Sequence, residues 1–142
     1  MTLTAIVIDD SPMQRLATGK LVKNNPNLKL RGTFDNPKIG LQAVNLLRPD
    51  VVFLDVEMPG LNGFEVLESL EYDCQVILNS TRSQFALNAF QYNHVKDYVT
   101  KPMKKDRFEK SVDRLIKNQC AKQKTEKFNS VPVYKERLRR AS

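Results

Sequence analysis

Four consecutive apolar residues, Val51 to Leu54, lead directly into the carboxylate of Asp55, and residues 59–63 then supply proline, glycine and asparagine for a turn. An apolar run without any polar residue predicts a strand that is buried on both faces, as in a parallel sheet. An acid at the carboxyl end of such a strand lies at the edge where open α/β sheets bind their ligands. The alternative is that Asp55 simply leaves the strand and faces water.

Two further predicted strands also end on charged residues. The apolar residues 5–8 run into Asp9 and Asp10, and the predicted strand at 95–99 is followed by Lys101. Parallel strands have their carboxyl ends at the same edge of a sheet. The sequence therefore predicts that three acids and one lysine lie together at this edge.

Strand and helix patterns alternate along the chain. Strands are predicted at residues 4–8, 28–34, 51–54, 75–79 and 95–99 from apolar runs and two-residue alternation. Helices are predicted at residues 12–23, 37–47, 63–70, 83–92 and 104–119 from apolar stripes at helical spacing. Strict alternation implies an α/β fold, with a doubly wound, five-stranded parallel sheet, right-handed crossovers and helices on both faces.

The stripes also predict which side chains face the sheet. Ser11 and Asn36 each precede a proline and are expected to open the first two helices. The inward residues expected in the first, second and last helices are Met13, Leu16, Ala17 and Leu21; Ile39, Ala43, Val44, Leu46 and Leu47; and Phe108, Val112, Leu115 and Ile116.

Composition limits the classes of protein that remain. The 142 residues suit one domain, and no apolar run is long enough to predict a membrane span or a signal peptide. The two cysteines fit no metal-binding spacing, so we expect reduced thiols and a cytoplasmic protein. Residues 1–116 hold 15 lysines and arginines against 14 acids, whereas residues 117–142 hold 8 against 2. The basic character therefore belongs to the end of the chain.

The predicted edge has the chemistry of a phosphoryl-transfer site. Three crowded carboxylates, Asp9, Asp10 and Asp55, repel one another, and an all-oxygen ligand set suits Mg²⁺. Ser80 adds a hydroxyl after the fourth strand, and Lys101 adds a positive charge after the fifth. A carboxylate is a competent nucleophile for phosphoryl transfer once cations neutralise the incoming oxygens. We therefore predict an aspartyl-phosphate site at Asp55.

These motifs resemble the receiver domain of a two-component response regulator, a CheY-like (βα)5 fold related to that of flavodoxin. The matching residues are Asp9-Asp10, the segment LDVEMPGLNG around Asp55, Ser80 and the Lys101-Pro102 pair. The resemblance implies that Asp55 is the phosphoacceptor, with a sensor histidine kinase or a phosphotransfer protein as phosphoryl donor. It implies no enzyme activity beyond self-phosphorylation and autodephosphorylation.

The resemblance also implies roles for the residues around Asp55. Asp10 would bind Mg²⁺ directly, Asp9 largely through water, and Asp55 and the backbone carbonyl of Glu57 would complete the ligands. Ser80, Lys101 and the backbone N–H of Thr81 would hold the phosphoryl oxygens, and the Lys101-Pro102 bond would be cis.

Tyr98 falls at the position of the aromatic switch residue of this family. Ser80 would move toward the phosphate and the ring of Tyr98 would turn inward, which changes the face formed by the fourth helix, fifth strand and fifth helix. This face is also the expected homodimer contact. The alternative is a half-buried strand tyrosine without a switch role.

Thr81, and Glu57 together with Arg82, set this chain apart from the usual pattern of the family, and one segment points to a subgroup within it. Thr81 stands where a smaller residue is usual, which narrows access to the phosphate. Glu57 and Arg82 either pair above the phosphate and hinder the hydrolytic water, or are two solvated charges. The segment FALNAFQYNHVKDYVTKPM is most similar to receivers attached to LytTR-type DNA-binding domains.

The domain division predicted is a receiver at residues 1–119 and a basic tail or linker remnant at residues 120–142. The tail is expected to be a solvated end or linker, and its charge alternatively suits a nucleic acid or an acidic partner. DNA binding is expected only if an output domain is missing from this chain, and no membrane contact is expected. A phosphohydrolase with an aspartate nucleophile is a further alternative, but residues 55–59 lack its D-x-D-G-T pattern.

Overall fold

The computed structural model describes residues 1–129, and residues 130–142 lie outside the described part of the chain. The strands are β1 (Leu3–Ile8), β2 (Leu28–Phe34), β3 (Val51–Asp55), β4 (Gln75–Ser80) and β5 (Val95–Thr100). The helices are α1 (Pro12–Lys23), α2 (Pro37–Leu47), α3 (Gly63–Glu68), the short 3-10 helix η1 (Ser83–Phe85), α4 (Ala86–Ala89) and α5 (Lys105–Asn129). All neighbouring strands pair in parallel in the order β2-β1-β3-β4-β5. The predicted doubly wound α/β fold is confirmed.

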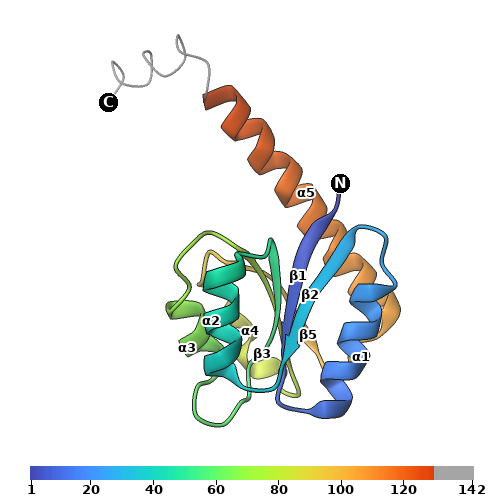
Figure 1. Ribbon diagram of the computed structural model, residues 1–142, viewed down its shortest axis with the longest axis vertical. Coiled ribbons are helices and arrows are strands. Elements are labelled where there is room, and N and C mark those ends of the chain that lie inside the picture. The colour runs from blue at the N-terminus through green and yellow to red at the C-terminus, as the bar shows by residue number, and fades with distance from the viewer. Residues whose placement is uncertain (130–142) are drawn as a thin grey trace.

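Helices cover both faces of the sheet (Figure 1). Successive side chains of a strand point to opposite faces, so β3 contributes Val52 and Leu54 to one core and Val51 and Phe53 to the other. The first core lies under α2, α3 and α4, and the second lies under α1 and α5. Burial on both faces explains why β3 has no polar residue before Asp55.

The predicted helix starts are confirmed by their capping contacts. The Ser11 hydroxyl accepts a hydrogen bond from the backbone of Gln14 at 3.4 Å, and the side chain of Asn36 caps α2. Asn62 and Glu65 form a reciprocal capping box at the start of α3. Side-chain caps satisfy backbone N–H groups that have no partner within the helix. They fix where three helices begin after the strand ends.

The predicted inward stripe of α1 is largely wrong. Met13 and Leu16 have 78% and 62% of their surface exposed. The residues of α1 that are buried against the sheet are Thr18, Gly19 and Val22. A helix approaches a sheet most closely through small residues, so a hydrophobicity stripe alone does not identify the contact side of α1.

The stripe of α2 is corrected in the same way. Ile39, Leu46 and Leu47 are exposed, whereas Val44 is buried and Ala43 lies partly buried against the core. A Cβ atom at Gly40 would lie 2.8 Å from Ile8 Cδ1, which shows how closely this helix approaches β1. The stripe of α5 is confirmed, because Phe108, Val112 and Leu115 are buried in the second core and Ile116 packs against it.

Three helices differ in length from the prediction. The helix predicted at 63–70 ends two residues earlier, at Glu68. The predicted helix at 83–92 is a 3-10 turn followed by the four-residue α4. The last helix was expected to end near Gln119, but α5 continues to Asn129 and projects past the edge of the sheet where the strands begin (Figure 1). The predicted division at residue 119 therefore falls within a continuous helix, and it stays a prediction.

Among residues 1–129, no helix combines the length and the apolar character that crossing a bilayer requires.

Candidate functional site

The carboxyl ends of β1 and β3 bring three acids together. One carboxylate oxygen from each of Asp9, Asp10 and Asp55 lies within 4.8 Å of the others. Asp9 and Asp55 are each only 1% exposed, and Asp10 is the most open of the three. The cluster predicted from the strand ends is therefore present, with its open side at Asp10.

Lys101, which follows β5, is the cation of the cluster. Its Nζ lies 3.1 Å from Asp55 Oδ1 and 3.2 Å from Asp9 Oδ2, and only 10% of its side chain is exposed. One ammonium group does not balance three carboxylates. Asp9 Oδ2 and Asp55 Oδ2 are buried and accept no hydrogen bond in the described structure. The site thus keeps an excess of negative charge, and one buried oxygen, Asp55 Oδ2, has neither a hydrogen bond nor an ion pair among the described residues.

This imbalance perturbs Asp55 itself. Burial and the neighbouring charge of Asp9 raise the pKa of Asp55 to about 7, although Lys101 opposes the shift. A cation at the cluster would favour the charged carboxylate instead.

The residues present fit a divalent cation. Their donors are all carboxylate oxygens, which suit a hard ion such as Mg²⁺ rather than a softer metal. Asp55 Oδ2, which accepts no hydrogen bond, and Asp9 Oδ2, which is paired with the ammonium of Lys101, mark the buried side of such a site. The side chains required for the predicted metal site are thus in place, whereas the role of the Glu57 carbonyl stays a prediction.

Ser80 and Thr81 are engaged by Glu57. The Ser80 hydroxyl donates to Glu57 Oε1 at 2.6 Å, and the Thr81 hydroxyl donates to Glu57 Oε2 at 2.8 Å. The hydrogen bond from Ser80 lowers the pKa of Glu57, and its effect outweighs that of burial. Arg82 Nε lies 3.9 Å from Glu57 Oε1, at the outer limit of an ion pair. The expected pairing of Glu57 with Arg82 is therefore secondary to its contacts with the two hydroxyls.

Tyr98 is already turned inward. Its side chain lies in the first core, only 8% of the residue is exposed, and its hydroxyl donates to the backbone carbonyl of Arg82. The backbone N–H of Arg82 donates in turn to Ser80 Oγ at 3.0 Å. Tyr98 is thus connected to Ser80 through one residue. The Lys101-Pro102 peptide bond is cis, as the resemblance implies.

The sequence interpretation missed a buried charge cluster beside Tyr98. Asp97 is 1% exposed and accepts hydrogen bonds from Arg107, Arg114 and Ser111 of α5. Residues 107, 111 and 114 recur at helical spacing, so they share one side of α5. That spacing was available in the sequence, but a polar stripe usually indicates a solvated face.

Asn79 was also missed. It pairs in register with Asp55, is 2% exposed, and its Oδ1 is buried without a hydrogen-bond partner in the described residues. Its place directly after the apolar residues 76–78 of β4, one residue before Ser80, is the indication that the sequence offers.

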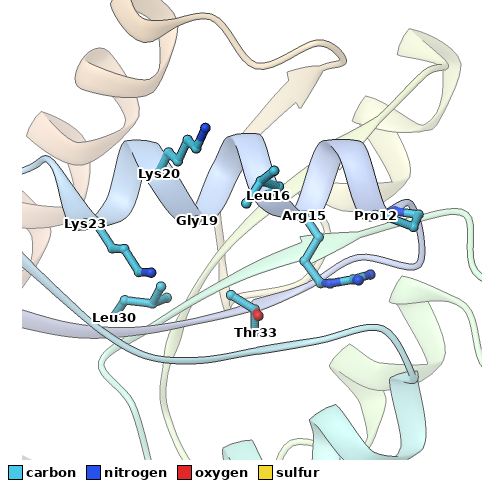
Figure 2. Close-up of a pocket in the computed structure, with 8 residues that line it drawn as sticks. All are labelled: Pro12, Arg15, Leu16, Gly19, Lys20, Lys23, Leu30 and Thr33. Atoms are coloured by element: carbon cyan, nitrogen blue, oxygen red, sulfur yellow. The ribbon is translucent and has the colours of Figure 1, made fainter.

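A separate groove of about 370 Å³ lies between α1 and β2 (Figure 2). Its lining combines apolar residues such as Leu16 and Leu30 with the cations Arg15, Lys20 and Lys23. The guanidinium of Arg15 donates to the backbone carbonyl of Asp9 at 2.9 Å. The groove therefore adjoins the acidic cluster but does not contain its carboxylates.

Comparisons with known proteins agree with this geometry. The sequence pattern of the protein family described as the response regulator receiver domain matches residues 5–113. A response regulatory protein of Vibrio vulnificus is 38% identical over 117 residues, which cover 81% of this chain and 48% of that protein. The transcriptional regulatory protein BtsR of Escherichia coli is 31% identical over 115 residues, which cover 80% of this chain and 48% of that protein.

A solved structure is similar as well. The response regulator domain of CheB from Thermotoga maritima superposes with a TM-score of 0.67 at 26% identity, covering 85% of this chain and 96% of that one. This chain spans about half the length of the curated relatives that it matches. The fold, the acidic cluster and the match over residues 5–113 together show that the chain belongs to the family of response regulator receiver domains.

Proposed function

We propose that Asp55 accepts a phosphoryl group from a sensor histidine kinase or a phosphotransfer protein. The observation that carries the proposal is the environment of its carboxylate. Asp55 is buried, its Oδ1 lies 3.1 Å from the ammonium of Lys101, and its Oδ2 has no hydrogen bond. A buried acid with one oxygen neutralised and one oxygen free is suited to nucleophilic attack.

In the proposed reaction, an Asp55 oxygen forms a bond to phosphorus as the bond from phosphorus to the donor breaks. Lys101 holds one of the transferred oxygens by its positive charge. Asp10, Asp55 and the carbonyl of Glu57 would hold Mg²⁺ directly and Asp9 largely through water, and the ion would neutralise charge on the phosphoryl oxygens. The backbone N–H of Thr81 and the hydroxyl of Ser80 donate to the remaining oxygens.

The proposed output is a change of the surface formed by α4, β5 and α5. Ser80 contacts the phosphoryl group, and the backbone of Arg82 connects Ser80 to Tyr98. Arg82 directly precedes η1, which leads into α4, so a shift of this residue moves the start of η1 and with it α4. Phosphorylation thereby biases the contact surface for a partner or a second receiver.

We further propose a cytoplasmic location and a larger regulatory context. Cys74 and Cys120 are both free thiols, which suits a reducing compartment. The relative BtsR is a transcriptional regulatory protein about twice as long as the matched region. DNA binding by a LytTR-type output domain is the second candidate function, and it requires a domain beyond the receiver.

The first test is the intact mass of the protein after incubation with acetyl phosphate and Mg²⁺. We expect one phosphoryl adduct in the wild type and in Asp113→Asn, which changes an exposed acid of α5, and none in Asp55→Asn or without Mg²⁺. An adduct that persists in Asp55→Asn would place the phosphoacceptor elsewhere. Rapid hydrolysis of phosphate monoesters would favour the phosphohydrolase alternative.

A further inference from the structure

Both hydroxyls that follow β4 donate to the same carboxylate. Glu57 Oε1 accepts a hydrogen bond from the Ser80 hydroxyl at 2.6 Å, and Glu57 Oε2 accepts one from the Thr81 hydroxyl at 2.8 Å. Short hydrogen bonds to a charged acceptor are stronger than bonds between neutral groups. Ser80 is fully buried, whereas the side chain of Glu57 is 36% exposed. The partly exposed side chain of Glu57 therefore holds the buried hydroxyl of Ser80 through a hydrogen bond.

This contact occupies the donor that the phosphoryl group would need. A serine hydroxyl carries one proton, so it donates to one acceptor at a time. Ser80 Oγ already accepts the backbone N–H of Arg82 at 3.0 Å. While these contacts persist, Ser80 cannot donate to an oxygen on Asp55 without leaving Glu57.

We propose that Glu57 is a positioning residue that holds Ser80 in its resting orientation and releases it when Asp55 is phosphorylated. This inference rests on the proposed phosphoacceptor role of Asp55. The backbone N–H of Glu57 donates to Asp55 Oδ1 at 3.1 Å, so both residues belong to one short turn. A phosphoryl dianion on Asp55 competes for the proton of Ser80 and repels the Glu57 carboxylate.

The structure also provides a place for the released carboxylate. Arg82 Nε already lies 3.9 Å from Glu57 Oε1, and the Arg82 side chain is 61% exposed and free to approach. On phosphorylation, the Glu57 carboxylate would thus leave the hydroxyls of Ser80 and Thr81 and pair with the guanidinium of Arg82. Because the backbone of Arg82 also bonds Ser80 and Tyr98, this exchange acts on the residue that connects the site to the output surface.

The proposal is tested by the affinity of the protein for beryllofluoride with Mg²⁺, measured by ¹⁹F NMR. Glu57→Ala should bind this phosphoryl mimic about tenfold more tightly, since a competing charge-assisted hydrogen bond is removed. Glu57→Gln, which keeps an acceptor but no charge, should give a smaller gain. Glu109→Ala, an exposed glutamate of α5, should bind like the wild type. The substitutions leave the backbone carbonyl of residue 57 in place.

A double-mutant cycle separates this mechanism from simple charge repulsion. If Glu57 acts through Ser80, Glu57→Ala should change the affinity by less than about twofold in a Ser80→Ala background. If the gain is equally large in that background, Glu57 acts only through its charge, and the positioning role is refuted although Asp55 remains the site of binding.

A measurement without metal or mimic tests the resting contact by itself. Glu57→Ala should lower the hydrogen-exchange protection of the Arg82 amide severalfold, because Ser80 Oγ is no longer held beneath it. Glu109→Ala should not. If Glu57→Ala lowers the protection of the Arg82 amide but the wild type does not bind beryllofluoride, the contact between Glu57 and Ser80 is supported and the proposed function is refuted. Unchanged protection would refute the positioning role.

Discussion

Asp55 is the last residue of β3, and Asp97 lies within β5, the edge strand of the same sheet. Both aspartates are buried, yet their pKa values shift in opposite directions. Burial raises the pKa of both, and Asp9 raises that of Asp55 further, to about 7. At Asp97, hydrogen bonds from Arg107 and Ser111 outweigh burial and lower the pKa. A fully bonded acid acts as a structural charge, whereas an acid with an unsatisfied oxygen is able to react.

Asp97 therefore makes stability depend on pH. Its folded-state pKa lies below the unfolded value of about 3.9, so its contribution is present above that value and is lost as pH falls through the folded-state pKa. We expect Asp97→Asn to lower the free energy of unfolding at pH 7 by about 2 kcal/mol, because both partly exposed arginines lose hydrogen bonds to an ionised partner. The difference from the wild type should shrink below about pH 4.

Urea denaturation of both proteins from pH 7 to pH 3 measures this difference. Asp113→Asn on the exposed side of α5 is the control and should stay within about 0.5 kcal/mol of the wild type. A difference for Asp97→Asn that is as large at pH 3 as at pH 7 would show that packing, rather than the ionised carboxylate, accounts for the loss.

The residues of the site differ in how visible they were in the sequence. Asp9, Asp55 and Lys101 were predicted because each lies at or just after the end of a predicted strand, and the ends of parallel strands converge by topology alone. The contact of Glu57 with Ser80 and the buried amide of Asn79 were not predicted. They depend on side-chain orientation across a loop and across neighbouring strands, which one-dimensional spacing does not encode.

At the level of elements, the loop that carries Glu57 is held by the close approach of α3 to β3. The N–H of Gly63 donates to the carbonyl of Val56 at 2.9 Å. A Cβ atom at position 63 would lie 2.7 Å from the Asp55 carbonyl oxygen and 2.9 Å from Val56 Cα. Both neighbours are backbone atoms and cannot move aside as a flexible side chain would. Glycine is therefore required where α3 begins.

We expect Gly63→Ala to lower the free energy of unfolding by about 1–3 kcal/mol, the usual cost of overpacking. It should also slow phosphorylation by acetyl phosphate, because the turn that follows Asp55 is displaced. Thermal unfolding and the rate of adduct formation measure the two effects.

Gly19→Ala is the matched control in α1. Its Cβ would lie at an ordinary 3.6 Å from Thr33 Cγ2, and alanine favours the helix by up to about 1 kcal/mol. Unfolding should then occur at the same or a higher temperature. If Gly63→Ala behaves like Gly19→Ala, the approach of α3 to β3 does not constrain the loop.

The same close approaches explain why the strands were predicted better than the helices. All five predicted strands lie within one residue of the observed bounds. The strands β1, β3 and β4 are buried on both faces and leave apolar runs, and β2 shows a two-residue alternation of buried and more exposed side chains. In α1 and α2, however, glycine occupies the side nearest to the sheet and exposed residues such as Leu16 and Leu46 stand away from it. A helix that packs through small residues gives a misleading hydrophobic stripe.

Across the whole molecule, the two ends of the sheet carry different features. The acidic cluster lies where the strands end, and the second half of α5 projects from the edge where they begin (Figure 1). Between these ends, the chain of contacts Ser80–Arg82–Tyr98 runs toward α4. We therefore expect a charge on Asp55 to act on a surface at the side of the molecule rather than on the far end of α5.

Leu87 of α4 tests whether this surface forms the proposed homodimer. Its side chain is 85% exposed, and α4 begins four residues after Arg82, the residue that links Ser80 to Tyr98. Light scattering should show a monomer alone and a dimer with beryllofluoride and Mg²⁺. Leu87→Glu should weaken the dimer at least about tenfold, since burial of a leucine contributes about 1.5–3 kcal/mol.

Leu46 of α2 provides a control of equal exposure on another helix. It is 82% exposed, and it lies on α2, which contributes no residue to the hydrogen bonds that join Ser80, Arg82 and Tyr98. Leu46→Glu should therefore dimerise like the wild type. Equal weakening by both substitutions would indicate general association through exposed apolar groups, and a monomer in every state would exclude the homodimer. Weakening by Leu87→Glu alone would connect the charge on Asp55 to one defined surface.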